Sequence, residues 1–304
     1  MRRIASNVSF QLERGFTLVE MIVSITLLSL MAMAAVPMLR MPVGAYLEAQ
    51  ARVEVSRELD TVQTRLNADL ARALPNSVRL RTVGARQFLE FLDVRAEGRH
   101  RAGASGAPQV CPAVCAAAGN NDSLEPACTE RCFTTLGPLV GDPPAVGADW
   151  VVVNPLSATG AAGNPYTGGA AGVAAGIMSR LTALAVVAGG QRLDITAKNF
   201  SSVAASGHVY VVSGPVTYEC NPATRLLTRH DGYAISAVQP VAFGAAQSAP
   251  LASGVLACTF AYTPTGASNR GGLVQLSLRF LRMPSGGVVP ELTDLVLTAQ
   301  VLQP

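Results

Sequence analysis

Two cysteines in the carboxy-terminal half of the chain have the chemistry of a structural disulfide. Cys220 and Cys258 each lie in a segment whose apolar and polar residues alternate, which is the pattern of a strand with one buried face. Buried thiols rarely stay unpaired in an oxidising compartment outside the cytoplasm. We therefore expect Cys220 and Cys258 to form a disulfide across a sheet.

The other four cysteines form two pairs with the same spacing, Cys111-x3-Cys115 and Cys128-x3-Cys132. In a helix each pair lies one turn apart, so two antiparallel turns would join Cys111 to Cys132 and Cys115 to Cys128. A four-cysteine zinc site is the alternative, but export oxidises thiols. We expect a disulfide-stapled helical hairpin and no metal site. Three connectivities are possible, and the sequence does not choose among them.

The remaining candidate groups indicate neither catalysis nor a cofactor. His100, His208 and His230 share no metal-ligand spacing. The glycine-rich stretch Gly160–Gly176 lacks the Gly-Lys-Ser/Thr ending of a phosphate-binding loop, so we expect a flexible surface loop. No Ser/His/Asp set and no pair of carboxylates stands out. We expect a protein that is not an enzyme and that needs no cofactor.

The element that must position the rest of the chain is a long apolar segment near the amino terminus. The segment from Phe16 to Leu39 has 24 residues, and its one ionisable residue is Glu20. A helix of this length extends about 36 Å, enough to cross a bilayer core of about 30 Å. Arg2, Arg3 and Arg14 precede it, which predicts a cytoplasmic amino terminus. A lone carboxylate in such a segment is costly in lipid and calls for a function.

The start of this segment carries a specific resemblance. Gly15-Phe16-Thr17-Leu18-Val19-Glu20 resembles the prepilin-peptidase and N-methylation motif of type IV pilins and type II secretion pseudopilins. The resemblance implies cleavage between Gly15 and Phe16 and methylation of the new Phe16 amine. It also implies that Glu20 acts in assembly and that Pro37, where pilins commonly carry a proline, kinks the helix. An ordinary single-pass anchor with an incidental Glu is the alternative.

Beyond the apolar segment the pattern first stays helical and then alternates. Leu59, Val62, Leu66 and Leu70 recur at helical spacing, which predicts one helix from about Phe16 to Leu74. Alternating segments after it predict strands at 77–83, 87–94, 150–154, 193–197, 208–212, 216–220, 255–262, 273–282 and 292–301.

Together with the resemblance, these patterns imply an α+β, type IV pilin-like fold. In it a long amino-terminal helix, whose first half spans the membrane, packs on an antiparallel β-sheet globular domain. The expected divisions are a leader peptide at 1–15, a transmembrane and filament-core helix half at 16–41, and an amphipathic half at 42–75. A β-rich globular domain follows at 76–304, with a cysteine-rich insertion at about 104–148.

A second resemblance is spread over the globular region. Ala73-Leu74-Pro75-Asn76-Ser77-Val78-Arg79 and Leu89-Glu90-Phe91-Leu92, with Val209–Cys220 and Cys258, resemble MshO-like minor pilins of the mannose-sensitive haemagglutinin pilus. This implies a minor pilin that acts in pilus assembly or initiation, adhesion or motility. A minor pseudopilin of a type II secretion system and a tip adhesin or ligand-binding subunit are the alternatives. The implied partners are other major and minor pilin subunits, the prepilin peptidase and methyltransferase, the inner-membrane pilus assembly platform and inner-membrane lipid.

Composition agrees with an exported, largely apolar protein. The 304 residues are 49% hydrophobic and 14% charged, with a net charge of +3 that falls to +1 without the leader. This near-neutral balance argues against bulk nucleic-acid binding. The expected location is a single pass through the inner membrane with the globular domain in the periplasm, and then the extracellular pilus.

Overall fold

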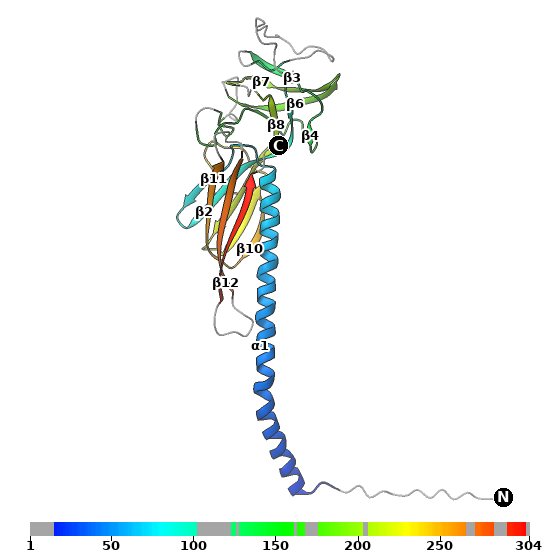
Figure 1. Cartoon of the computed structure of the whole chain (residues 1–304), viewed down its shortest axis with the longest axis vertical. Helices are drawn as coiled ribbons and strands as arrows, with labels where there is room; N and C mark the ends of the chain where they lie inside the picture. The colour runs from blue at the N-terminus through cyan, green and yellow to red at the C-terminus, as the bar shows by residue number, and fades with distance from the viewer. Residues whose placement is uncertain are drawn as a thin grey trace, which may run out of the picture. The chain divides into compact units, whose positions relative to one another are not determined.

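The computed structural model describes residues 15–101, 123–125, 128–160, 163–167, 176–202, 206–265, 271–282 and 291–301. The chain divides into two compact units, one of Met1–Val53 with Met283–Val289 and one of Glu54–Arg282 with Pro290–Pro304. The helix α1 (Leu18–Ala71) contributes to both units (Figure 1).

The amino-terminal part of α1 has the composition of a membrane span. Leu18–Val36 is long and apolar enough to cross a bilayer, and none of it is buried in the protein. The hydroxyls of Ser24, Thr26 and Ser29 donate to backbone carbonyls three or four residues earlier, at 2.7 to 2.9 Å. These side chains therefore satisfy their polar groups within the helix, as a lipid environment requires.

The helix ends three residues earlier than the pattern predicted, because the chain then bonds to a strand. The Leu74 backbone N–H donates to the Leu92 carbonyl at 2.7 Å, and the Val94 N–H donates to the Arg72 carbonyl at 2.7 Å. Pro75 follows, and Asn76 has a left-handed φ of 57°, a conformation that asparagine tolerates. The backbone groups of Arg72 and Leu74 therefore form hydrogen bonds with β2 instead of continuing the helix.

Strands make up the rest of the larger unit. Their bounds are β1 (Arg79–Val83), β2 (Arg86–Arg99), β3 (Thr129–Thr134), β4 (Val140–Gly141), β5 (Trp150–Val153), β6 (Met178–Val187), β7 (Gly190–Asn199), β8 (His208–Asn221), β9 (Leu226–Asp231), β10 (Gln247–Ser253), β11 (Val255–Thr265), β12 (Gly271–Arg282) and β13 (Glu291–Val301).

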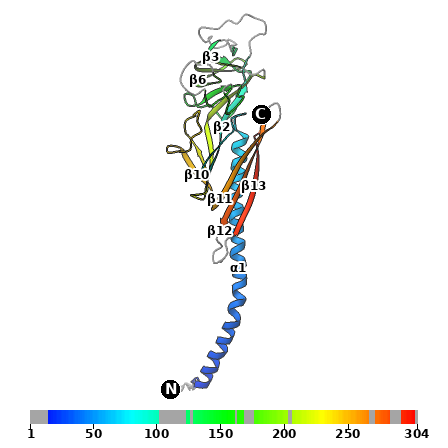
Figure 2. The same cartoon turned by 90° about the vertical axis from the view of Figure 1, so that its left-hand side faces the viewer.

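All strand pairs are antiparallel and form two sheets. Ten strands share one sheet, in which β1-β2-β8-β5-β6-β7-β3 is the main path, β9 pairs with β8 and β10, and β4 pairs with β2. The second sheet has the order β11-β12-β13. Figure 2 shows its strands, in orange and red, beside the carboxy-terminal part of α1.

The long strands β2 and β8 are the spine of the larger sheet, and the spine is irregular at one point. Asp93 pairs with Gly214 and Val94 pairs with Val212, so Ser213 and Arg95 fall outside the ladder. Gly214 has a φ of 151°, which favours glycine. Such a bulge bends the strands and redirects side chains.

Three apolar cores lie along this spine. The largest contains Val62, Leu66 and Leu70 of α1, and it is closed on one side by β2 and β8 and on the other by β12 and β13. Alternation is regular in the small sheet, where Val274, Leu276, Leu278 and Phe280 are buried and their neighbours are not. The second core joins β5, β6, β7, β8 and β3, and the third lies around Tyr166, Val152 and Tyr210.

Two local predictions are wrong. Cys132 lies in the strand β3, with Cys128 just before it, rather than in a helical hairpin. Residues four apart share a face in a strand as well as in a helix, so the spacing does not distinguish the two. The predicted flexible loop at Gly160–Gly176 includes a packed turn, because Tyr166 is buried and its hydroxyl donates to the Ser77 carbonyl at 2.7 Å. Residues 161–162 and 168–175 lie outside the described residues.

Candidate functional site

The segment that resembles a processing site is an exposed helix start. Gly15 precedes the helix, and a Cβ built on it meets no atom within 4 Å. Phe16 is 75% exposed. The Glu20 backbone N–H donates to the Thr17 hydroxyl at 3.2 Å, which makes Thr17 the N-cap of α1. Gly15 and Phe16 therefore lie in non-helical, accessible chain, as a protease substrate requires.

Thr17 is a residue that the sequence argument did not assign. Thr17-x-x-Glu20 is the capping-box pattern, which signals a helix start when an apolar run follows. Glu20 lies in the first turn of α1, where a negative charge interacts favourably with the helix dipole. Glu20 therefore has a local structural role besides any role in assembly, and a test of assembly must separate the two.

The other predicted site residues lie elsewhere. The helix assignment runs without a break through Pro37, and a kink there stays a prediction. The disulfide Cys220–Cys258 is present, with its Cα atoms 6.3 Å apart, and it joins β8 to β11. Cys128 and Cys132 are disulfide-bonded as well. Cys111 and Cys115 lie outside the described residues, so the connectivity of these four cysteines stays a prediction.

A serine, a histidine and a glutamate come together on β10, β9 and β8, although no sequence spacing links them. The His230 Nδ1 lies 2.7 Å from the Ser248 hydroxyl, and its Nε2 lies 3.1 Å from a Glu219 oxygen. The Glu219 carboxylate also binds Arg86 at 2.8 Å, and Phe243 stacks on the imidazole with ring centres 4.1 Å apart. Burial lowers the pKa of His230, which favours the neutral ring. These contacts satisfy one another and tie three strands together.

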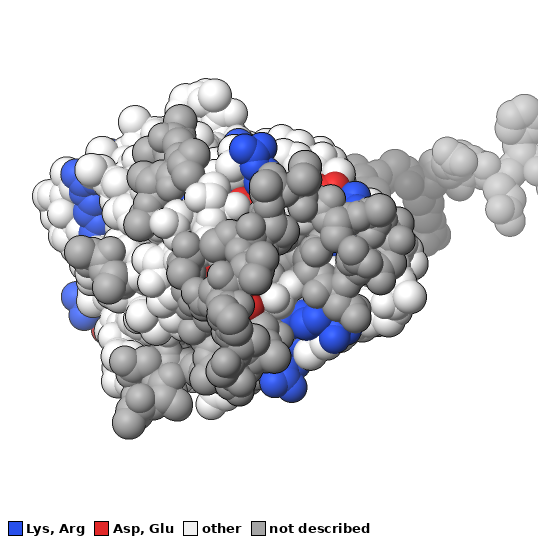
Figure 3. Space-filling view, turned by 90° about the horizontal axis from the view of Figure 1, so that it is seen from above, with Lys and Arg blue, Asp and Glu red and all other residues white. Residues whose placement is uncertain are grey.

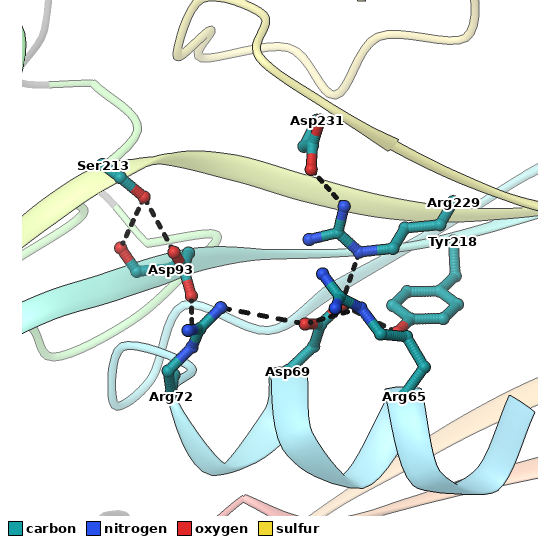
Figure 4. A network of polar contacts seen from close by, with 8 residues as sticks. All are labelled: Arg65, Asp69, Arg72, Asp93, Ser213, Tyr218, Arg229 and Asp231. Carbon is teal, nitrogen blue, oxygen red and sulfur yellow. Dashed lines mark hydrogen bonds and ion pairs between the residues drawn. The ribbon is translucent and has the colours of Figure 1, made fainter. Parts of the chain in front are cut away.

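A buried carboxylate organises the end of α1 (Figure 4). Asp69 is 1% exposed, and one of its oxygens accepts hydrogen bonds from the Tyr218 hydroxyl at 2.9 Å and from Arg229 Nε at 2.5 Å. The other oxygen lies 3.2 Å from Arg65 Nε. Arg229 also pairs with Asp231. Asp69 thus fastens the helix to β8 and β9.

The same network continues to the bulge of the spine. Arg72 Nε lies 3.1 Å from an Asp93 oxygen, and the Ser213 hydroxyl donates to the other Asp93 oxygen at 2.8 Å. Burial raises the pKa of Asp93, while the bond from Ser213 and the charge of Arg72 lower it. Asp93 therefore links the helix end to the two strands at their irregular point.

A second buried acid lies at the start of β2. Glu90 is fully buried and accepts a hydrogen bond from Arg79 at 2.8 Å. Burial raises the pKa of Glu90 to about 7, and the Arg79 charge offsets only part of this effect. The Arg79 guanidinium also donates to the Ser236 and Ala237 carbonyls. Glu90 is thus a titratable group within the core.

The outer surface carries charged side chains as well, among them Asp60 on α1 and the exposed pair Arg279 and Asp294. On the described atoms of the face drawn in Figure 3, Lys and Arg form several separate groups, some of them with Asp or Glu beside them. Among the described residues, no group of three or more His, Cys, Asp or Glu side chains has the arrangement of a metal site.

One comparison with known proteins identifies the amino-terminal segment. The family model of the prokaryotic N-terminal methylation motif matches residues 11–36. No curated protein and no solved structure matches the chain. The motif, the apolar helix and the antiparallel sheets fit a membrane-anchored protein of the type IV pilin or pseudopilin kind, which a prepilin peptidase processes and which assembles with other pilins.

Proposed function

We propose that this chain is a minor type IV pilin of the MSHA type, which is cleaved after Gly15, methylated at Phe16 and incorporated below the tip of the pilus. The observation that carries the proposal is the methylation motif at residues 11–36, which covers the apolar segment Leu18–Val36, none of it buried in the protein. Before assembly the leader stays in the cytoplasm and the strands lie in the periplasm, as the arginines of the leader favour.

Glu20 supports a specific mechanism of incorporation. A carboxylate near the bilayer centre costs about 2.5–3.5 kcal/mol on insertion scales, and less near the interface. Cleavage creates a positive amine on Phe16, four residues before Glu20 in the chain. The amine of a neighbouring subunit, staggered along the filament, can lie level with the carboxylate and neutralise it. Assembly then stabilises the Glu20 charge, which is unfavourable in the isolated subunit. The pairing of Glu20 with the neighbouring amine also sets the axial register between the two subunits.

Two alternatives share this chemistry. A minor pseudopilin of a type II secretion system would be processed in the same way but would remain in the periplasm. A tip adhesin would present its globular region to a surface, and the polar cleft described below favours that role. Antibody labelling of sheared extracellular filaments separates a pilus subunit from a pseudopilin, because a pseudopilin is absent from the sheared fraction.

The processing step is tested by Gly15→Val. Within the chain a side chain at this position meets open space, so the substitution does not disturb the protein itself. We expect the leader to stay attached because the side chain clashes with the peptidase, and mass spectrometry of the membrane fraction then gives the full precursor. Efficient cleavage of the variant would contradict the assignment.

A further inference from the structure

A polar cleft lies where the end of α1 meets the bulge of the β2–β8 spine. Its volume is about 740 Å³, which is within the range of small-ligand sites. The lining comes from α1, β2, β5, β6, β8 and β9, and all of it lies in Glu54–Arg282. Bulges are over-represented next to binding sites because they redirect side chains, and both bulged residues, Ser213 and Arg95, line this cleft.

Arginine dominates the charge of the cleft. Its five basic lining residues are Arg65, Arg72, Arg95, Arg180 and Arg229. Two aspartates, Asp93 and Asp231, line the cleft. Two more lie outside the lining and pair with its arginines, Asp69 with Arg65 and Asp149 with Arg95. Five guanidinium groups thus face four carboxylates, which leaves one positive charge.

Arg180 is the arginine in excess. Among the described residues it pairs with no carboxylate, and it donates instead to the Ala148 carbonyl. Its guanidinium carbon lies 4.0 Å from the centre of the Trp150 ring, a cation–π contact that holds the group in place. A guanidinium fixed on a ring but without a counterion is prepared to bind an anion.

Three other arginines have terminal N–H donors that form no hydrogen bond with a described residue. Arg65, Arg72 and Arg95 approach their aspartates through Nε, at 3.2, 3.1 and 2.9 Å, and their side chains are 46%, 48% and 35% exposed. The terminal nitrogens of these three groups make no hydrogen bond to a described residue, and Arg72 Nη2 lies 3.9 Å from the nearer Asp69 oxygen. Two parallel N–H groups of this kind match the two oxygens of a carboxylate.

The acidic and aromatic lining restricts which anion fits. Asp93 and Asp231 disfavour a ligand with several negative charges, and their oxygens, with the Ser213 hydroxyl, can bind hydroxyl groups. Trp150 and Tyr233 add aromatic surface. We propose that this cleft binds a sugar acid, in which one carboxylate meets the arginines and the ring hydroxyls meet the aspartates. The proposal goes beyond a role in assembly and does not depend on processing at Gly15.

Titration calorimetry on the full-length chain in detergent micelles tests the proposal, with sodium glucuronate as the probe. We expect saturable binding of glucuronate, and binding of glucose and of inorganic phosphate at least about tenfold weaker, since each lacks half of the matching groups. Absence of glucuronate binding would overturn the proposal, and so would equal binding of glucose or phosphate.

Two variants locate the site. Arg180→Gln removes the unpaired cation, and Arg65→Gln removes a half-exposed one that does not contact Trp150. We expect each to weaken glucuronate binding about tenfold. Arg279→Gln is the matched control, because Arg279 lies on β12 and pairs with the exposed Asp294 outside the cleft. Unchanged affinity in a folded Arg65→Gln variant, checked by circular dichroism, would place binding elsewhere.

Discussion

At the scale of single residues, Glu90 shows how burial determines the protonation state of a carboxyl group. Its carboxylate has one oxygen on Arg79 and one, Oε2, without a hydrogen-bond partner among the described residues. Burial penalises the charged form more than Arg79 stabilises it, so the folded protein holds the proton to about pH 7. The unfolded chain releases the same proton near its ordinary pKa of 4.5.

This difference predicts a pH dependence of stability. Between about pH 4.5 and 7 the folded state binds more protons at Glu90 than the unfolded state, so the free energy of unfolding falls as the pH rises through this window. The full effect of one such group is about 3 kcal/mol. Urea titrations of wild type and Glu90→Gln at pH 5 and pH 8 measure it, and the variant is expected to lose less stability over this interval.

Asp60→Asn is the control, since Asp60 is exposed on the same chain and its substitution is expected to leave the slope of the wild type unchanged. An identical slope in wild type and Glu90→Gln would show that Glu90 does not titrate in this range.

At the scale of elements, the attachment of α1 to the sheet depends on Asp69. Removing one partner of a buried ion pair leaves an uncompensated charge, which costs about 3–5 kcal/mol. Asp69→Ala removes the acceptor of two hydrogen bonds, one from the Arg229 guanidinium and one from the Tyr218 hydroxyl. We expect the free energy of unfolding to fall by about 3 kcal/mol, measured in urea. Asp69→Ala with wild-type stability would mean that Asp231 alone satisfies Arg229.

The disulfide joins the two sheets and carries a second prediction. Cys220 and Cys258 are 38 positions apart, and a disulfide closing a loop of this size contributes about 3–4 kcal/mol in the chain-entropy model. A double Ser variant is expected to become protease-sensitive in its globular region while leader cleavage continues. Peptide mapping after limited proteolysis identifies the cut sites, and resistance equal to that of wild type would assign the bond no role in stability.

Local patterns predicted most elements, and long-range geometry explains the rest. The helix and the strands β11, β12 and β13 follow regular periodicity, so their existence was predictable. β8 was predicted as two strands because Gly214-Pro215 looks like a break, but a bulge keeps both halves in one strand. The strands β6 and β9 do not alternate regularly between apolar and polar residues, so the pattern did not predict them. The arginine cleft unites residues from six elements, and no spacing in the sequence connects them.

At the scale of the whole molecule, our proposal assigns to Glu20 the contact between one subunit and the next. Glu20→Leu is expected to be cleaved and to stay in the membrane, yet to enter filaments poorly, because no carboxylate remains to pair with a neighbouring Phe16 amine. The measurement is the amount of variant in sheared pili relative to its membrane pool, by immunoblotting.

Thr17→Ala separates assembly from helix capping. It removes the cap that the Glu20 N–H uses and keeps the carboxylate. Normal incorporation of Thr17→Ala with poor incorporation of Glu20→Leu supports charge pairing between subunits. Equal loss in both variants would mean that Glu20 acts through the helix start alone.

The position of the carboxy-terminal part of α1 between two sheets also constrains the order in which the core can form. In a chain delivered amino terminus first, the face formed by Val62, Leu66 and Leu70 emerges about 200 residues before Leu276 and Leu297, which close its core. Until then this face lacks one wall and is open to wrong partners. The core around α1 is therefore completed only after β12 and β13 have been delivered, so the buried face of the helix is exposed during the delivery of the whole intervening chain.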